Sequence, residues 1–278
     1  MKKLFDTVSV ASSKLVTNTY STSFSFGIYC LGRKLRNPVY GIYGFVRLAD
    51  EIVDSFHGYN KKELLDEFEA ETWKAIERRI SLNPVLNSFQ DVVNRYGIER
   101  GLIESFLGSM RMDLRRHSHS KDSYENYILG SAEVVGLMCL RVFTDGNDKA
   151  FQRLRPAAMR LGAAFQKVNF LRDLREDFGS LGRSYFPGLD LSRFSEADKK
   201  NIEAEILADF DEALKGIRQL PASSRLGVYV AYVYYCRLFR KIQLLPPRTV
   251  LTKRIRVPNH EKISLLIGSF FRHSFKMI

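Results

Sequence analysis

The feature that most limits how this chain can fold is a stripe of polar side chains inside an apolar segment. Its members recur every three or four residues and are Tyr43, Arg47, Asp50 and Asp54. This spacing places them on one face of an α-helix. A second stripe at the same spacing consists of Gln166, Asn169, Asp173 and Asp177. Helical periodicity dominates the rest of the chain as well, which predicts an all-α protein.

Most acidic residues at this spacing lie on solvated helix faces. We expect this of Glu63, Glu67 and Glu71, which lie among other charged residues. The two stripes differ because apolar residues surround them, and carboxylates in such surroundings usually need a partner. Two aspartates four residues apart also repel each other when both are ionised. A divalent cation would offset this repulsion.

Mg²⁺ fits the side chains of the two stripes. It takes oxygen ligands, usually one or two carboxylates, and completes its octahedron with substrate phosphates and water. Asn169 offers a further oxygen at the right helical pitch. If the two helices face each other, they form an acidic pocket in an apolar bundle. The pattern therefore predicts a metal–diphosphate site above a hydrocarbon cavity.

The chain reads as one all-α domain covering residues 1–278. Its 278 residues are 45 % hydrophobic and 27 % charged, a globular composition. Asn37 followed by Pro38 predicts a helix that opens at Pro38 and runs to about Phe56. Further helices are expected near 61–81, 85–96, 99–117, 122–143, 148–178, 196–219, 223–244 and 259–275. No run of about 18 uninterrupted apolar residues predicts a membrane span. The cysteines are expected to be buried thiols in a reducing cytoplasm, and they are Cys30, Cys139 and Cys236.

The net charge of +12 is concentrated near the C-terminus, where residues 237–278 contain ten Lys or Arg and one acid. A nucleic-acid partner would call for a recognition motif as well as charge, and the sequence has none. An anionic membrane surface is the better partner for this segment. The expected contact residues are Arg237, Arg240, Lys241, Arg248, Lys253, Arg254, Arg256 and Lys262. The alternative is that these charges are spread over several helices or bind substrate diphosphate.

With these stripes in place, the chain resembles the squalene and phytoene synthase family over nearly its whole length. The segments that carry the resemblance are 21–24, 40–54, 110–114, 127–141, 166–177 and 182–187. The resemblance implies a single isoprenoid-synthase helical bundle with a central apolar cavity.

The resemblance also implies roles for individual residues. Asp50 with Asp54, and Asp173 with Asp177, correspond to two Mg²⁺-binding aspartate motifs, and Mn²⁺ is a possible substitute. Tyr127 corresponds to a tyrosine that faces the cavity. The positions matched to binding of the substrate diphosphate are Ser21, Ser23, Arg47, Gln166, Asn169, Arg172, Arg183 and Tyr185. Arg172 lies about 100° from its stripe, so bracing of the carboxylates is an alternative role.

Two positions depart from the family pattern. Glu133 stands where many relatives have glycine, and a paired structural acid is as good an interpretation as a functional one. Gly130 replaces a position that is often aromatic, which predicts a wider cavity. Neither position belongs to the metal motifs.

The implied reaction joins two prenyl diphosphates head to head through a cyclopropylcarbinyl diphosphate. The expected product is phytoene from two geranylgeranyl diphosphates, without NADPH, and downstream carotenoid enzymes are possible partners. Squalene synthases of the reducing type tend to be longer and to carry a C-terminal anchor that this chain lacks. A dehydrosqualene or squalene-type reaction of the C15 donor is the alternative within the family. A non-catalytic assembly factor and a basic binding protein are alternatives outside it. The expected location is the cytoplasm, with peripheral attachment to membrane.

Overall fold

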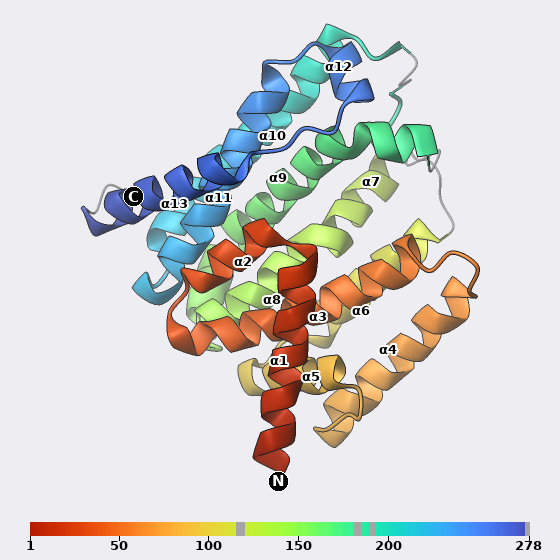
Figure 1. Cartoon of the computed structure of the whole chain (residues 1–278), viewed down its shortest axis with the longest axis vertical. Helices are drawn as coiled ribbons and strands as arrows, with labels where there is room; N and C mark the ends of the chain where they lie inside the picture. The colour runs from red at the N-terminus through yellow and green to blue at the C-terminus, as the bar shows by residue number, and fades with distance from the viewer. Residues whose placement is uncertain (115–119, 181–184, 190–192, 276–278) are drawn as a thin grey trace.

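In the computed structural model every described element is helical, which confirms the predicted all-α fold (Figure 1). The structure describes residues 1–114, 120–180, 185–189 and 193–275, with only the backbone at 22–23 and 176–180. The elements are α1 (Lys2–Tyr20), α2 (Thr22–Tyr29), α3 (Arg33–Asp54), α4 (Lys61–Arg78), α5 (Pro84–Tyr96), α6 (Arg100–Asp113), α7 (Lys121–Ile128), the π-helix η1 (Leu129–Glu133), α8 (Val134–Phe143), α9 (Asp148–Ser180), α10 (Glu196–Gln219), α11 (Ala222–Gln243), α12 (Pro247–Thr252) and α13 (Asn259–Ser274).

Helix α3 begins earlier than its sequence predicts. It starts at Arg33, so Pro38 lies inside the helix and Asn37 is not its N-cap. The backbone N–H of Gly32 donates to the carbonyl of Ser223 at 2.7 Å, which anchors the chain just before the helix. Pro38 removes one backbone hydrogen bond from the second turn. Burial of Pro38 and its neighbours in the core compensates for that loss.

The apolar face of α3 is fixed by stacked aromatic rings. Phe45 is fully buried, and its ring centroid lies 3.9 Å from that of Phe89 on α5. Phe68 of α4 stacks on the same ring with centroids 5.4 Å apart. These contacts set the rotation of α3 about its axis and thereby the direction in which its polar stripe points.

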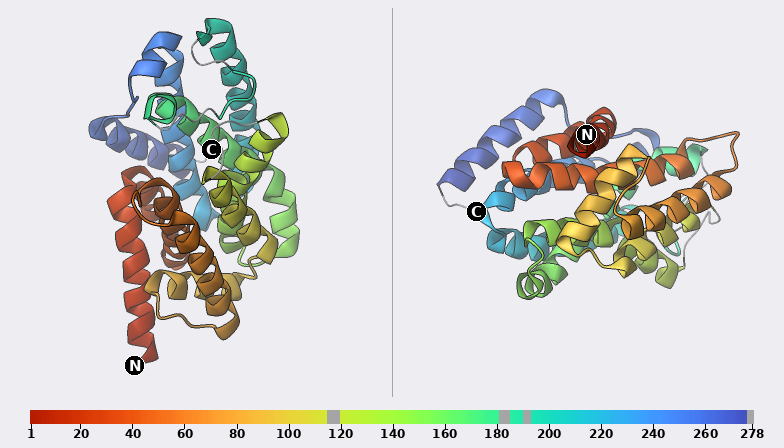
Figure 2. Two further views of the ribbon diagram at one scale, coloured as in Figure 1. Left: turned by 90° about the vertical axis from the view of Figure 1, so that its right-hand side faces the viewer. Right: turned by 90° about the horizontal axis from the view of Figure 1, so that it is seen from below.

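Helices α1, α2 and α12 were not predicted. Helix α1 packs on α3 and α5, and its buried residues are small: Ser9, Ser13 and Thr17. A Cβ atom at Gly44 would lie 2.9 Å from the Cβ of Ser13, so the two helices approach very closely there. The N-terminal helices occupy one end of the molecule and α9, α10 and α12 reach the other (Figures 1 and 2).

Lys121–Phe143 is a nearly continuous helical segment made of α7, η1 and α8. Among the described residues it is the one helix that is long and apolar enough to cross a membrane, with 23 residues, by length and composition alone. It packs on α6 and α9. Within it, Arg141 is buried and paired with Glu99 of the loop before α6. These contacts are those of a core helix of the bundle.

Candidate active site

One cavity of about 860 Å³ brings the two polar stripes together. Asp50 and Asp54 of α3 line it, and so do Gln166, Asn169 and Asp173 of α9. The fourth aspartate, Asp177, lies in α9 but its side chain falls outside the described residues, as does the side chain of Ser23. Arg183 lies outside them altogether.

The cavity is long and mostly apolar away from the carboxylates. Along α9 it is lined from Asp173 back to Leu154. These roughly 19 residues of helix span about 28 Å at 1.5 Å of rise per residue. The apolar part is lined by side chains of α2, α3, α8, α9, α10 and α11, among them Ile28, Leu161, Ile217 and Val228. The cavity thus joins a charged end to a deep hydrocarbon-like compartment.

The Arg47 guanidinium lies among carboxylates at the charged end. It donates to Asp50 and to Glu51, the latter at 2.6 Å, and Tyr20 packs its ring against the guanidinium at 4.5 Å. Burial opposes ionisation of Glu51, but hydrogen bonds from Ser55 and Arg47 outweigh it and lower the pKa of Glu51. The Nε of Arg47 is buried without a hydrogen-bond partner. Buried unsatisfied N–H groups are rare, and an anionic oxygen bound at this end would satisfy this one.

Asp173 is paired with two guanidiniums. The Nε of Arg172 donates to its two oxygens at 3.0 and 3.1 Å, so Arg172 does brace the carboxylate. Burial disfavours the charge of Arg172, but hydrogen bonding to Asp173 outweighs it and raises the pKa of Arg172. The Nε of Arg254 lies 3.1 Å from Oδ1 of Asp173. Arg254 comes from the segment after α12, and it therefore lies in the candidate site rather than in a surface cluster of membrane contacts.

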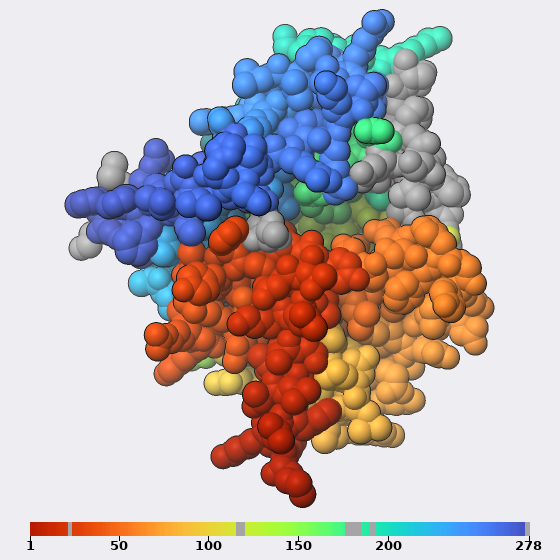
Figure 3. All heavy atoms as spheres, in the orientation of Figure 1, coloured from red at the N-terminus to blue at the C-terminus, as the bar shows by residue number. Residues whose placement is uncertain are grey.

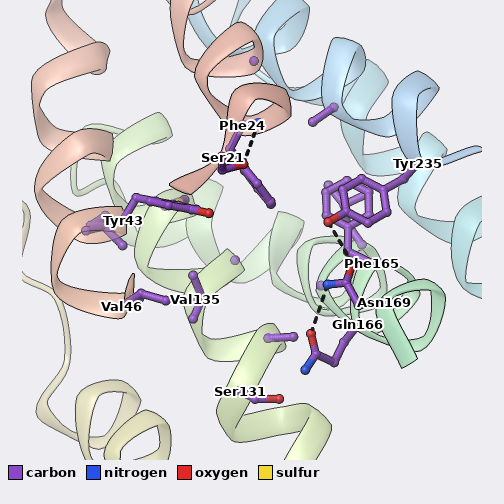
Figure 4. A pocket seen from close by; sticks show the side chains of 18 of the residues that line it. Ser21, Phe24, Tyr43, Val46, Ser131, Val135, Phe165, Gln166, Asn169 and Tyr235 are labelled. Carbon is purple, nitrogen blue, oxygen red and sulfur yellow. Dashed lines mark hydrogen bonds between the residues drawn. The ribbon is translucent and has the colours of Figure 1, made fainter. Parts of the chain in front are cut away.

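A short ladder of polar side chains leads from α11 to α9 (Figure 4). The Tyr235 hydroxyl donates to Oδ1 of Asn169 at 3.2 Å, and Nδ2 of Asn169 donates to Oε1 of Gln166 at 3.4 Å. Burial raises the pKa of Tyr235 to about 12, so its hydroxyl stays protonated and remains a donor. The ladder orients the amides of the second stripe toward the cavity.

Ser21 is positioned by its place at the start of α2. Its side chain accepts a hydrogen bond from the Phe24 backbone N–H at 3.3 Å, as an N-cap residue does. The side chains of Ser21 and Tyr43 point toward each other in Figure 4. Burial raises the pKa of Tyr43, although Ser21 and Arg47 lower it. Ser21 and Tyr43 both line the cavity. The N-terminus of α2 also directs its partial positive charge to this place, which favours an anion there.

Tyr127 of α7 also lines the cavity, and its hydroxyl is held by an acid. Its hydroxyl donates to Oδ2 of Asp113 at 2.9 Å. Burial and the Asp113 carboxylate raise the pKa of Tyr127 well above its usual range, so the phenol is neutral. The Tyr185 ring lies 5.3 Å from that of Tyr127 and stacks on Phe170 at 4.2 Å. Tyr127, Asp113 and Tyr185 all line the cavity.

Aromatic rings line the cavity next to the polar side chains of the site, where the Tyr235 hydroxyl bonds to Asn169. Phe165 stacks on Tyr235 with ring centroids 3.9 Å apart, and Phe24 lies 5.2 Å from Tyr43. All four rings line the cavity. Faces of aromatic rings attract cations, so this region can stabilise a carbocation. Periodicity does not single out Phe165, Tyr235 or Arg254 from other aromatic or basic residues, whereas Asp113 lies in segment 110–114, which carries the family resemblance.

Among the described residues, no group of three or more His, Cys, Asp or Glu side chains forms a ready cage for a metal ion. Mg²⁺ rarely uses such a cage, because it keeps water and takes phosphate oxygens beside one or two carboxylates. Asp50 with Asp54, and Asp173 with Asn169, are donor sets of that kind. The partly buried carboxylates fit ions that arrive with a diphosphate.

The two departures from the family pattern both lie outside the residues that line the cavity. A Cβ at Gly130 would meet the Ser105 carbonyl oxygen at 2.5 Å, so glycine is needed there for close packing on α6. The prediction that Gly130 widens the cavity is wrong. Glu133 is part-exposed in η1, and burial raises its pKa to about 6 although Arg160 lowers it. Unlike Gly130 and Glu133, the apolar residue Ile28 of α2 lines the cavity.

A helical bundle with this cavity and this charged end has the fold of the isoprenoid synthases. The squalene/phytoene synthase family model matches residues 17–261, and the chain belongs to this family. The fold agrees, because a dehydrosqualene synthase crystal structure superposes with a TM-score of 0.81 and 20 % identity, covering 98 % of both chains. Squalene synthase HpnC from Alicyclobacillus acidocaldarius gives a TM-score of 0.74 at 20 % identity, covering 88 % of this chain and 95 % of that one.

Sequence relatives carry the name phytoene synthase. Phytoene synthase 1 of Arabidopsis thaliana, a chloroplast protein, is 28 % identical over 266 residues, which are 89 % of this chain and 62 % of the relative. The chain thus spans somewhat less than two thirds of the length of that plant protein. Phytoene synthase of Arthrospira platensis is 25 % identical over 277 residues, covering 90 % of this chain and 89 % of the relative.

Proposed function

We propose that this protein is a Mg²⁺-dependent prenyltransferase that condenses two geranylgeranyl diphosphates head to head to phytoene, a step of carotenoid biosynthesis. The observation that carries the proposal is the cavity itself, in which carboxylates and guanidiniums gather at one end of a long apolar compartment. Such a cavity matches a substrate with a charged head and a hydrocarbon tail. The relatives named phytoene synthase support the choice of reaction.

In this proposal Asp50, Asp54, Asn169 and Asp173 hold Mg²⁺, or Mn²⁺ in its place, together with Asp177. When bound, the metal neutralises charge on the departing diphosphate. No NADPH is required, because the product forms by loss of a proton rather than by reduction.

The guanidiniums of the site bind and orient the diphosphate. Arg47 offers its unpartnered Nε, and Arg172 and Arg254 lie across the cavity beside Asp173. Fixed positive groups at a place where negative charge develops lower the barrier to breaking the C–O bond. Ser21 and the start of α2 add donors to the same oxygens.

The aromatic and apolar walls act on the hydrocarbon part of the substrate. Loss of diphosphate from one molecule leaves an allylic cation, which adds to the double bond of the second molecule. The resulting tertiary cation loses a proton as the three-membered ring closes, and this gives the cyclopropylcarbinyl diphosphate. A second loss of diphosphate, rearrangement and loss of a proton complete the product. Phe165 and Tyr235 offer ring faces to the cations. Apolar walls exclude water, which would otherwise trap them.

The reaction is tested with purified protein, C15 and C20 prenyl diphosphates, and Mg²⁺, each with and without NADPH. We expect a C40 hydrocarbon from the C20 donor, independent of NADPH and abolished by a chelator. A C30 hydrocarbon alone, made from the C15 donor, would assign the chain to the dehydrosqualene or squalene-type reaction. No product from either donor would reject the proposed activity.

The depth of the cavity is tested by Leu161→Trp, about 18 Å along α9 from Asp173. The larger ring would fill the middle of the apolar compartment, so turnover of the C20 donor should fall at least about tenfold while the C15 donor is still accepted. The matched control is Arg153→Trp, on the exposed side of the same helix. An equal loss of turnover with both donors would show that this compartment does not determine the preference for the C20 over the C15 donor.

A further inference from the structure

Helix α13 presents an apolar face that no other described part of the chain covers. Five of its side chains, or those just after its end, are each between 51 % and 71 % exposed. They are Ile263, Ile267, Phe270, Phe271 and Phe275. At about 100° per residue they fall within an arc of roughly 140°. We call this the α13 face.

The arc of the α13 face contains no Asp, Glu, Lys or Arg, and its other members are His260, Ser264 and Ser274. Glu261, Lys262 and Arg272 point away from its arc, toward the body of the protein or the edge of the helix. The opposite side of the helix packs on α11, with Ser269 buried and Leu265 packed against the hydrophobic core that includes Tyr235 and Leu238. The helix is thus amphipathic in an unusual sense, because its apolar side is the outer one.

The surroundings of α13 favour an anionic surface over a second copy of this chain. Residues 237–278 contain ten Lys or Arg, and their single acid, Glu261, is already paired with Arg237 and Lys241. Two copies of such a segment repel each other, whereas anionic lipid headgroups attract it. The α13 face would then meet acyl chains while the basic residues around it meet headgroups.

The position of α13 also suits a hydrocarbon surface. It runs along the outside of the molecule and projects beyond it (Figure 3). Helix α11, on which it packs, lines the cavity with Gly227, Ala231 and Tyr234. Docking of α13 would therefore bring the cavity wall close to the bilayer.

We propose that α13 is an interfacial helix that inserts its apolar outer face into an anionic lipid bilayer. This differs from attachment by the basic residues alone, several of which have partners within the protein: Arg254 is paired with Asp173, and Arg237 and Lys241 with Glu261. The inference does not depend on the catalysed reaction, because it is measured as binding to lipid.

The test compares vesicle co-sedimentation of the full chain with that of the triple variant Ile267→Ser, Phe270→Ser, Phe271→Ser. The control variant carries Leu15→Ser, Leu82→Ser and Tyr59→Ser, which remove exposed apolar side chains elsewhere. With vesicles containing phosphatidylglycerol, the first variant should lose at least about tenfold in binding and the control should bind like the original chain. In about 1 M salt, where the Debye length is about 3 Å, the original chain should keep part of its binding.

Insertion is measured directly from the fluorescence emission of a tryptophan placed on the α13 face. In a Trp73→Phe background, Phe271→Trp should show a blue-shifted emission with vesicles, and Leu82→Trp should not. Binding of the triple variant equal to the original, or complete loss of binding in salt without a blue shift, would overturn the proposal. A change from dimer to monomer in the triple variant, with vesicle binding unchanged, would assign the face to self-association instead.

Discussion

Helices α3 and α4 both carry acidic residues at helical spacing, yet the structure gives them opposite surroundings. On α4, Glu63, Glu67 and Glu71 are exposed, and their helix packs through other residues. On α3, Asp50 and Asp54 line the cavity, and Asp50 is paired with Arg47. Spacing alone therefore does not distinguish a solvated face from a site. The apolar residues that surround the α3 stripe in the sequence do distinguish it.

Ion pairs contribute differently to stability on α4 and in the candidate site. On α4, ion pairs such as Lys62 with Asp66 at 2.8 Å are exposed, where they contribute little. In the site, the Asp173 side chain is only 18 % exposed and is paired with the guanidiniums of Arg172 and Arg254. Partly buried charges of this kind need their partners, and a diphosphate with its metal ions can exchange places with some of them.

The largest effect should follow removal of one carboxylate of the site. Asp50→Asn, or Asp173→Asn, should lower the rate of condensation at least about 10²-fold, because each removes a proposed metal ligand where charge develops. Steady-state kinetics at saturating Mg²⁺ measure this, with circular dichroism to confirm the fold. A turnover near that of the original chain would show that the substituted carboxylate is not needed for catalysis, as we expect of the α4 carboxylates.

The sequence predicted the stripes well because both lie on long helices with regular periodicity. It missed α1, whose buried side is made of Ser9, Ser13 and Thr17 rather than large apolar residues. Hydroxyls of Ser9 and Thr17 bond to carbonyls of their own helix, and close packing on Gly44 replaces hydrophobic burial. Such a pattern resembles a polar loop in the sequence.

The site was predictable to a similar degree. The side chain of Asp177 lies outside the described residues. Asp50, Asp54 and Asp173 were expected at the cavity and do line it, because helical geometry determines their neighbours. Arg254 was not, since it lies some 80 residues after Asp173 in a segment with no regular structure. Contacts of that range depend on how helices pack, which periodicity does not specify.

A smaller effect should separate two arginines that each contact an acid at about 3 Å. Arg254 contacts Asp173 at 3.1 Å, and Arg111 contacts Asp66 of α4 at 3.0 Å. Arg254→Gln should raise KM for the prenyl diphosphate about tenfold, because it removes a positive charge from the diphosphate site. Arg111→Gln should leave KM unchanged. If both variants behave alike, Arg254 serves only to neutralise Asp173.

Glu133 differs from the acids of both α3 and α4 because it is partly buried but does not line the cavity. Burial raises its pKa from 4.5 to about 6, so the folded state holds this proton more tightly than the unfolded state. Stability should therefore fall as pH rises from about 4.5 to about 6. The shift corresponds to about 2 kcal/mol at 1.36 kcal/mol per pKa unit, which solvent screening reduces to about 1 kcal/mol.

Glu133→Gln removes that ionisation. The variant should be more stable than the original chain by about 1 kcal/mol at pH 7 and no more stable at pH 4. Urea unfolding at the two pH values measures the difference. A variant that is less stable at pH 7 would mean that Arg160 and Lys167, which oppose the shift, depend on the Glu133 charge.

The smallest effect should come from the acidic face of α4. Glu63→Gln and Glu67→Gln alter exposed side chains in a row of mixed charges, so the free energy of unfolding should change by less than about 0.5 kcal/mol. The larger of the two changes is expected at Glu63, which lies in the first turn and whose carboxylate accepts from the Asn60 side chain at 3.0 Å. A negative charge in the first turn interacts favourably with the helix dipole, and Glu63→Gln removes that charge. Neither change should alter turnover or its dependence on Mg²⁺ concentration. A shift in that dependence would show that α4 carboxylates take part in binding metal, and the contrast with α3 would then be one of degree.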